Sequence, residues 1–284
     1  MSPRAAVLGS PIGHSLSPTL HRAGYAAAGL PDWHYSAHDV DEGGLASFVD
    51  GLGEEWRGLS LTMPLKVAAF DLAAEVTDTA RAAHAINTLV RTDTGWAADN
   101  TDVHGIVAAL RDAGVDRPRS AWIIGAGATA RSALLALRSL GGHEVTVAVR
   151  DEAKGTAFAD SVRDLGLDVG VVHLAGWGHE ARSRAEVVIS TVPGGPGNAA
   201  AAAALGVPGD PWMLVGTTLL DVVYADWPTP LGRAAAAHGA RVVSGLEMLV
   251  HQAARQFELF TGAPAPVAEM QVAGRTALGH TPDA

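Results

Sequence analysis

The stretch that decides the fold runs from Ser120 to Leu140 and reads SAWIIGAGATARSALLALRSL. Its apolar start, Ala121 to Ile124, predicts a strand, and its alanine- and leucine-rich end predicts a helix. Between them lies a G-x-G-x-x-A pattern, in which the first glycine permits a tight turn and the second lets a pyrophosphate approach the backbone. The helix N-terminus then offers free N–H groups to the phosphates. A strand-to-helix turn without a ligand is the simpler alternative.

The end of the next expected strand, Glu144 to Val149, tests the dinucleotide interpretation. An acidic residue there holds the ribose 2′-hydroxyl of NAD, whereas an arginine meets the 2′-phosphate of NADP. Arg150 stands at the tip and Lys154 follows one helical turn later, so the pattern favours NADP. Asp151 lies between the two cations and leaves NAD open.

Length and composition exclude several classes of protein. The 284 residues suffice for two domains, and 20 basic against 30 acidic residues give a net charge of −10, which argues against a nucleic-acid partner. The absence of cysteine excludes disulfides and thiolate chemistry. The twelve histidines show no metal-binding spacing, so no metal is expected. Without a signal region or an apolar run of about 20 residues, we expect a cytoplasmic protein with no membrane partner.

Strands and helices alternate along the first part of the chain, which predicts parallel βαβ units. A turn at Thr94-Gly95 adds one hairpin. The expected strands are 5–8, 33–37, 58–62, 86–91 and 96–98, and the expected helices are 17–28 with Ser17 as its cap, 43–51, one opening at Pro64, 77–85 and 103–113.

The second part of the chain shows the same alternation after residue 120. The expected strands are 144–149, 169–172, 187–190 and 219–222, and the expected helices include 198–205 and 244–261. The polar end, Gly279 to Ala284, is expected to be disordered.

Three polar residues invite a chemical role. Lys66 would lie in the first turn of the helix that Pro64 opens, where a cation faces the positive end of the helix dipole at a cost of up to about 1 kcal/mol. A proton donor and acceptor would justify that position, and a surface lysine is the alternative. Asp102 precedes an expected helix and could simply cap it, and Asn87 could be an ordinary strand-edge amide.

In their order along the chain, several motifs resemble those of the shikimate dehydrogenase family, over nearly the whole sequence. The carriers are Gly9-Ser10-Pro11-Ile12, His14-Ser15-Leu16-Ser17-Pro18, Leu61-Thr62-Met63-Pro64-Leu65-Lys66, Ala85-Ile86-Asn87-Thr88-Leu89, Asp99-Asn100-Thr101-Asp102, the glycine turn, Asp221-Val222-Val223-Tyr224, Thr229-Pro230-Leu231, and Gly245-Leu246-Glu247-Met248-Leu249 with Gln252. Departures are Ser60, where many members have asparagine, the segment Val103-His104-Gly105, and Val149 in place of an asparagine before Arg150.

The resemblance implies an α/β fold with an N-terminal substrate domain, a doubly wound Rossmann domain that binds NADP, and a C-terminal helix that returns to the substrate domain. The expected limits are residues 1–103, 104–240 and 241–284. It also implies reversible reduction of 3-dehydroshikimate to shikimate, a small-molecule partner, and a monomer or homodimer. Quinate or an amino-substituted shikimate is the alternative substrate, and a nucleotide-binding regulator without turnover is the alternative from another class.

Site residues follow from the resemblance position by position. The catalytic pair would be Lys66 and Asp102. Shikimate would be held by Ser15, Ser17, Thr62, Asn87, Tyr224 and Gln252. The cofactor would contact Asp78, Gly125, Ala126, Gly127, Ala128, Thr129, Arg150, Lys154, Val222 and Gly245.

Overall fold

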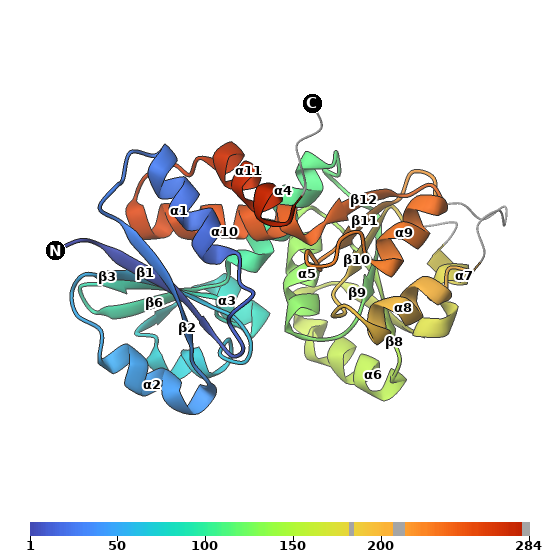
Figure 1. The fold of residues 1–284 in the computed structure, drawn as a ribbon. Coiled ribbons are helices and arrows are strands. Elements are labelled where there is room, and N and C mark those ends of the chain that lie inside the picture. Colours follow the sequence, from blue (N-terminus) through green and yellow to red (C-terminus); the bar gives the residue numbers. More distant parts are fainter. Residues whose placement is uncertain (182–184, 207–213, 280–284) are drawn as a thin grey trace. The chain divides into compact units, whose positions relative to one another are not determined.

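The computed structural model describes residues 1–181, 185–206 and 214–279, and the chain forms two compact units (Figure 1). The first unit comprises Met1–Gly105 and Leu249–Ala284, and the second comprises Ile106–Met248. The first limit lies at Gly105 rather than at residue 103. The C-terminal segment leaves the second unit only at Leu249 rather than at residue 241, because Arg241–Ser244 still pairs with the second sheet.

The sheet of the first unit has six strands in the order β2-β1-β3-β5-β6-β4. β1, β2 and β3 are parallel, and β5 runs antiparallel to both of its neighbours. The hairpin is present, whereas the two-residue β4 was not expected. The strands are β1 (Arg4–Gly9), β2 (His34–Asp39), β3 (Trp56–Leu61), β4 (Glu75–Val76), β5 (Thr88–Thr92) and β6 (Gly95–Asp99).

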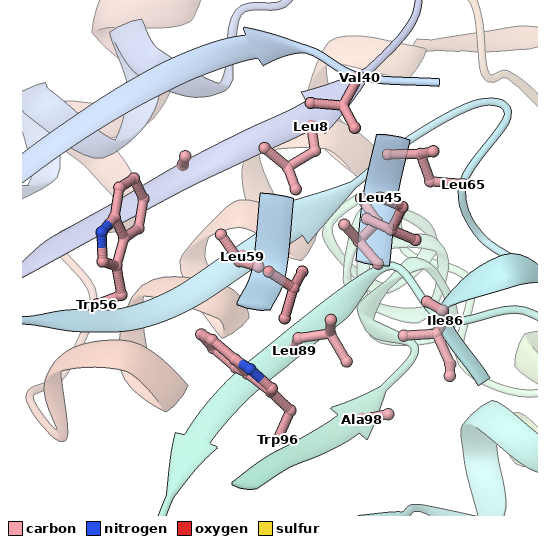
Figure 2. Close-up of a cluster of buried hydrophobic side chains, with 14 of the residues drawn as sticks. Leu8, Val40, Leu45, Trp56, Leu59, Leu65, Ile86, Leu89, Trp96 and Ala98 are labelled. Carbon is pink, nitrogen blue, oxygen red and sulfur yellow. The ribbon is translucent and has the colours of Figure 1, made fainter. Parts of the chain in front are cut away.

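Alternating side chains of these strands build two cores, one on each face of the sheet. Leu8, Leu59 and Leu89 belong to the core that meets α2 (Glu42–Asp50) and is drawn in Figure 2. On the other face the sheet meets α10, where a Cβ on Gly58 would lie 2.0 Å from the Phe260 ring. This alternation turns Gly58 and Ser60 toward α10. The helices of the unit are α1 (Ser17–Ala27), α2, α3 (Asp78–Ala83) and α11 (Val267–Ala277), with a 3₁₀ helix at Ala68–Leu72, the start of α4 (Thr101–Asp112) and the part of α10 (Gly245–Thr261) from Leu249 onward.

One helix start in the first unit differs from the prediction, and one helix was not predicted. Ser17 is the first residue of α1 and not its cap, because the capping position falls on Leu16. Helix α11 was missed, since its only buried residues are Met270 and Gly274 and the sequence therefore shows no apolar stripe. It packs against α1, where a Cβ on Gly24 would lie 3.3 Å from Met270 Sδ.

The second unit is a doubly wound sheet of six parallel strands in the order β12-β11-β10-β7-β8-β9, which confirms the predicted fold class. Its strands are β7 (Ser120–Ile124), β8 (Glu144–Val149), β9 (Asp168–His173), β10 (Val187–Ser190), β11 (Thr218–Asp221) and β12 (Arg241–Ser244). Its helices are α5 (Ala128–Ser139), α6 (Glu152–Ser161), α7 (Trp177–Ala181), α8 (Pro196–Ala203) and α9 (Pro230–Ala237), with 3₁₀ helices at Arg163–Leu165 and Leu174–Gly176.

In the described ranges, no helix has the length and apolar character that crossing a membrane requires. The predicted disorder of the chain end concerns residues that, from 280 onward, lie outside those ranges.

Candidate active site

One edge of the first sheet collects the polar residues of the first unit. β1 and β3 end at this edge because they are parallel, and the antiparallel β5 begins there. β6, antiparallel to β5, ends there as well. The segments that carry the predicted residues Ser15, Ser17, Thr62, Asn87 and Asp102 therefore extend from the same edge of the sheet.

Lys66 and Asp102 form an ion pair at this edge. Lys66 Nζ lies 2.5 Å from Asp102 Oδ2, and the two side chains are 20% and 9% exposed. The pair is thus largely shielded from water but still open on one side. A lysine and a carboxylate in this arrangement can give a proton to a bound oxygen and take it back.

The helix expected at Pro64 does not form, so the dipole argument for Lys66 was wrong. Lys66 lies in a turn that precedes the 3₁₀ helix Ala68–Leu72. Its carbonyl oxygen accepts a hydrogen bond at 2.8 Å from the backbone N–H of Ile86, which lies in the segment before β5, and not from a donor in a helix. The backbone of Ile86 therefore anchors Lys66 beside Asn87.

Asn87 holds the other oxygen of Asp102. Asn87 Nδ2 donates to Asp102 Oδ1 at 2.8 Å, and Asn87 Oδ1 accepts from the backbone N–H of Thr101 at 2.7 Å. Both carboxylate oxygens of Asp102 are bonded to side chains, although the residue lies in the first turn of α4. Asn87, only 2% exposed, is a buried link and not a strand-edge amide.

Gln252 lies beside this cluster, and the two serines lie where α1 begins. Gln252 Oε1 lies 3.4 Å from Thr101 Oγ1 and 3.5 Å from Asn87 Nδ2. Ser15 Oγ accepts from the backbone N–H of Ser17 at 3.3 Å, at the start of α1. Hydroxyl and carboxamide groups of this kind suit a ligand that carries several hydroxyls.

The second unit contains a pocket of about 760 Å³ at the carboxyl ends of its strands, lined by residues that follow β7, β8 and β10. Gly125 has φ +108°, and a Cβ there would lie 2.6 Å from Thr191 Oγ1. Gly127 caps α5, and a Cβ there would meet nothing within 4 Å. The first glycine is needed for the turn, and the second leaves room beside the helix N-terminus.

The same pocket is lined by Arg150, Asp151 and Lys154. Asp151 Oδ1 accepts from the backbone N–H groups of Ala153 and Lys154 at 3.1 and 3.2 Å, so this carboxylate caps α6. The two cations are exposed. A carboxylate committed to its own helix and two exposed cations fit a phosphate on the ribose better than a bare hydroxyl.

The remaining predicted residues lie in three places. Val222 follows β11 and touches the start of α10, where a Cβ on Gly245 would lie 2.1 Å from Val222 O. Tyr224, two residues later, is half-buried, and burial raises its pKa. Ala126 lines the pocket, and Ala128 and Thr129 open α5. Asp78 is exposed in the first turn of α3, in the first unit.

Sequence reasoning missed several buried residues that support the cluster. Thr88, Thr101 and Gln256 each contact Asn87. Gln256 had a usable signal, because it follows Gln252 by four residues and so lies on the same face of α10.

Comparisons with known proteins identify the family of this chain. The model of the shikimate dehydrogenase substrate binding domain matches residues 7–89, and that of the shikimate 5′-dehydrogenase C-terminal domain matches residues 245–271. A shikimate dehydrogenase (NADP(+)) of Moorella thermoacetica is 36% identical over 281 residues, which cover 96% of this chain and 93% of the relative. The chain belongs to the shikimate dehydrogenase family.

Two solved structures of this family extend the likeness to the fold. The shikimate dehydrogenase of Mycobacterium tuberculosis has a TM-score of 0.86 and 41% identity, and the match covers 96% of this chain and 99% of that one. The Thermus thermophilus enzyme in complex with NADP(H) and shikimate has a TM-score of 0.84 and 30% identity, with 97% and 100% covered. The family resemblance predicted from the motifs is thus confirmed.

Proposed function

We propose that this member of the shikimate dehydrogenase family is an NADP-dependent enzyme that interconverts shikimate and 3-dehydroshikimate. The observation that carries the proposal is the Lys66–Asp102 pair, 2.5 Å apart and joined to Asn87 at the sheet edge. A proton donor and acceptor, a fixed carboxylate and several hydroxyl-binding groups are what reversible reduction of a ring ketone needs from the protein.

Lys66 would donate a proton to the ketone oxygen as that oxygen becomes an alkoxide, and it would accept the proton in the reverse direction. Asp102 would accept a hydrogen bond from a ring hydroxyl and keep the ammonium of Lys66 in place. The carboxylate oxygen that faces Asn87 cannot rotate away without losing a 2.8 Å hydrogen bond. The orientation of the substrate therefore depends on the amide as well as on the charged pair.

The hydroxyls and the carboxylate of shikimate would be bound by a ring of neutral donors and acceptors. Neutral groups suit this task because they do not compete with Lys66 for the charge of Asp102. The proposed set is Ser15, Ser17, Thr62, Asn87, Tyr224 and Gln252.

The pocket of the second unit has the features that a dinucleotide requires. Gly127 leaves open space at the N-terminus of α5 for the pyrophosphate, and Arg150 and Lys154 supply charge for a 2′-phosphate. When bound, NADPH supplies the hydride. The residues proposed to hold it are Asp78, Gly125, Ala126, Gly127, Ala128, Thr129, Arg150, Lys154, Val222 and Gly245.

A four-way assay tests the function. The purified protein is mixed with shikimate or quinate, each with NADP or NAD, and the absorbance of the reduced cofactor is followed. We expect the highest kcat/KM with shikimate and NADP. A higher kcat/KM with quinate would make quinate the preferred substrate, and a higher kcat/KM with NAD would make NAD the preferred cofactor. If no mixture formed reduced cofactor, the proposed activity would be refuted.

A further inference from the structure

A row of buried polar side chains leads from β2 to the Lys66–Asp102 pair. It comes from four elements that are distant in sequence, namely β2, β3, β5 and α10. Its members are 0–4% exposed and are Tyr35, Ser60, Thr88 and Gln256. None of them is among the substrate or cofactor residues proposed above.

Backbone groups fix the direction of the first hydrogen bonds in this row. Gln256 lies 3.1 Å from the backbone carbonyl oxygen of Asn87, which can only accept, so the Gln256 atom there is Nε2. Gln256 Oε1 must then face Ser60 Oγ, 2.7 Å away, and Ser60 donates to it. Ser60 Oγ in turn accepts from the Tyr35 hydroxyl at 2.6 Å.

A second backbone group fixes the other end. The N–H of Thr101 can only donate, so the atom of Asn87 that it meets at 2.7 Å is Oδ1, and Nδ2 is turned toward Asp102. Thr88 Oγ1 accepts from Gln256 Nε2 at 3.0 Å and donates to Asn87 Oδ1 at 2.7 Å. Gln256 therefore holds Asn87 in two ways. It bonds the main-chain carbonyl oxygen of Asn87 directly, and it reaches the side chain of Asn87 through Thr88.

Every donor in the row points toward Asp102. Buried hydrogen bonds in such a chain polarise one another, with a strengthening of about 10–30% per bond. We propose that Gln256, supported by Ser60 and Tyr35, is a positioning residue that fixes the Asn87 carboxamide and, through it, the carboxylate that holds Lys66. This role rests on the proposed function, because the geometry it protects is that of the proton-transferring pair.

Ser60 makes this arrangement specific to the present chain. Many members of the family have asparagine at this position, and its side chain has two more heavy atoms than that of serine. With Ser60 Oγ already 2.7 Å from Gln256, an asparagine would have to occupy the space of the Gln256 amide. Serine at position 60 and glutamine at position 256 therefore form one matched unit.

A double-variant cycle tests the proposal. Gln256→Met keeps the length of the side chain and removes all of its hydrogen bonds. We expect kcat to fall about tenfold, because misplacement of catalytic groups by about 1 Å can cost up to about a hundredfold. If Gln256 acts through Asn87, adding Gln256→Met to Asn87→Ala should lower kcat by less than about twofold. An equal loss in both backgrounds, or an unchanged kcat in the single variant, would overturn the proposal.

Phe260→Leu on the same helix is the matched control, because it loosens the buried cluster that contains Tyr35 but removes none of the hydrogen bonds of the row. It should leave kcat within about twofold of the unchanged protein at a temperature where all variants are folded. Tyr35→Phe removes the hydroxyl that donates to Ser60 and that also lies beside Ser17, and it is the second variant if Gln256→Met does not fold. It is expected to lower kcat about two- to threefold, because it removes one hydrogen bond that lies far from Asp102. A kcat equal to that of the unchanged protein would contradict the proposed chain of donors.

A readout without turnover separates this proposal from the proposed function. The side-chain amide resonances of Asn87 should shift in Gln256→Met and stay in place in Phe260→Leu. Unmoved resonances in Gln256→Met would overturn the positioning role. A protein that forms no reduced cofactor yet shows this shift would instead contradict the activity alone.

Discussion

Among single residues, Lys66 offers the clearest test of the proposed proton transfer. Lys66→Ala removes the group proposed to transfer the proton while Asn87 still bonds Asp102. We expect kcat to fall by about 10²- to 10⁴-fold and KM for shikimate to change far less, as for loss of general acid and base catalysis. Steady-state kinetics measure both constants, with the exposed Arg119→Ala as the control. A Lys66→Ala protein with the kcat of the unchanged enzyme would disprove the assignment.

At the same scale, Arg150 is expected to decide the choice of cofactor. Arg150→Ala removes a cation from the pocket, and a hydrogen bond to a charged group contributes about 1.5–3 kcal/mol. We therefore expect KM for NADP to rise about ten- to a hundredfold, with little change for NAD, in parallel titrations of both cofactors. Arg163→Ala, a change to an exposed cation outside the pocket, serves as the control. Equal effects on both cofactors would contradict the proposed contact between Arg150 and the 2′-phosphate.

At the scale of elements, the glycine turn between β7 and α5 contains one glycine that the fold requires and one that is expected to serve cofactor binding. Gly125→Ala places a Cβ at φ +108° and 2.6 Å from Thr191 Oγ1, so the free energy of unfolding should fall by about 1–3 kcal/mol. Gly127→Ala meets no atom within 4 Å, so its stability should change by less than about 0.5 kcal/mol. KM for NADP should rise in Gly127→Ala because the methyl group enters the pyrophosphate space. Urea unfolding compares the two variants, and equal losses of stability would contradict the distinction.

At the scale of the whole molecule, a buried histidine is expected to weaken the fold in acid. His21 stacks on Tyr35 at 4.0 Å, and burial lowers its pKa to about 3, although the neighbouring Gln256 side chain opposes the change. The unfolded chain takes up a proton below about pH 6.5 and the folded one does not. The free energy of unfolding should therefore fall as the pH drops from 6.5 toward 3, by up to about 1.4 kcal/mol per pH unit.

His21→Phe removes this contribution and keeps an aromatic ring against Tyr35. Its free energy of unfolding, measured in urea between pH 7 and pH 4, should depend less steeply on pH than that of the unchanged protein. His34→Asn, at an exposed position of β2, is the control and should follow the unchanged protein. Parallel curves for His21→Phe and the unchanged protein would show that His21 does not set the acid response.

Much of the fold was predictable because its signals are local. Residues 120–140 encode strand, turn and helix within a few residues of one another, and the apolar run at 144–149 forms β8 with the predicted limits. The tip of that strand places Arg150 in the pocket for the same reason, since a strand fixes the direction in which the next residues leave it. Helix α11 escaped prediction because it buries only Met270 and Gly274, which leave no periodic apolar signature.

The sequence by itself determined the doubly wound sheet, the glycine turn, the basic strand tip and the set of motifs that marks the family. Only the tertiary structure decided that Lys66 lies in a turn bound to Ile86, and that Tyr35, Ser60 and Gln256 support Asn87. The physical reason is the separation in sequence of the residues that interact. Propensity and periodicity act over neighbouring residues, whereas these hydrogen bonds join segments up to 196 residues apart and exist only after strand order has brought the segments together.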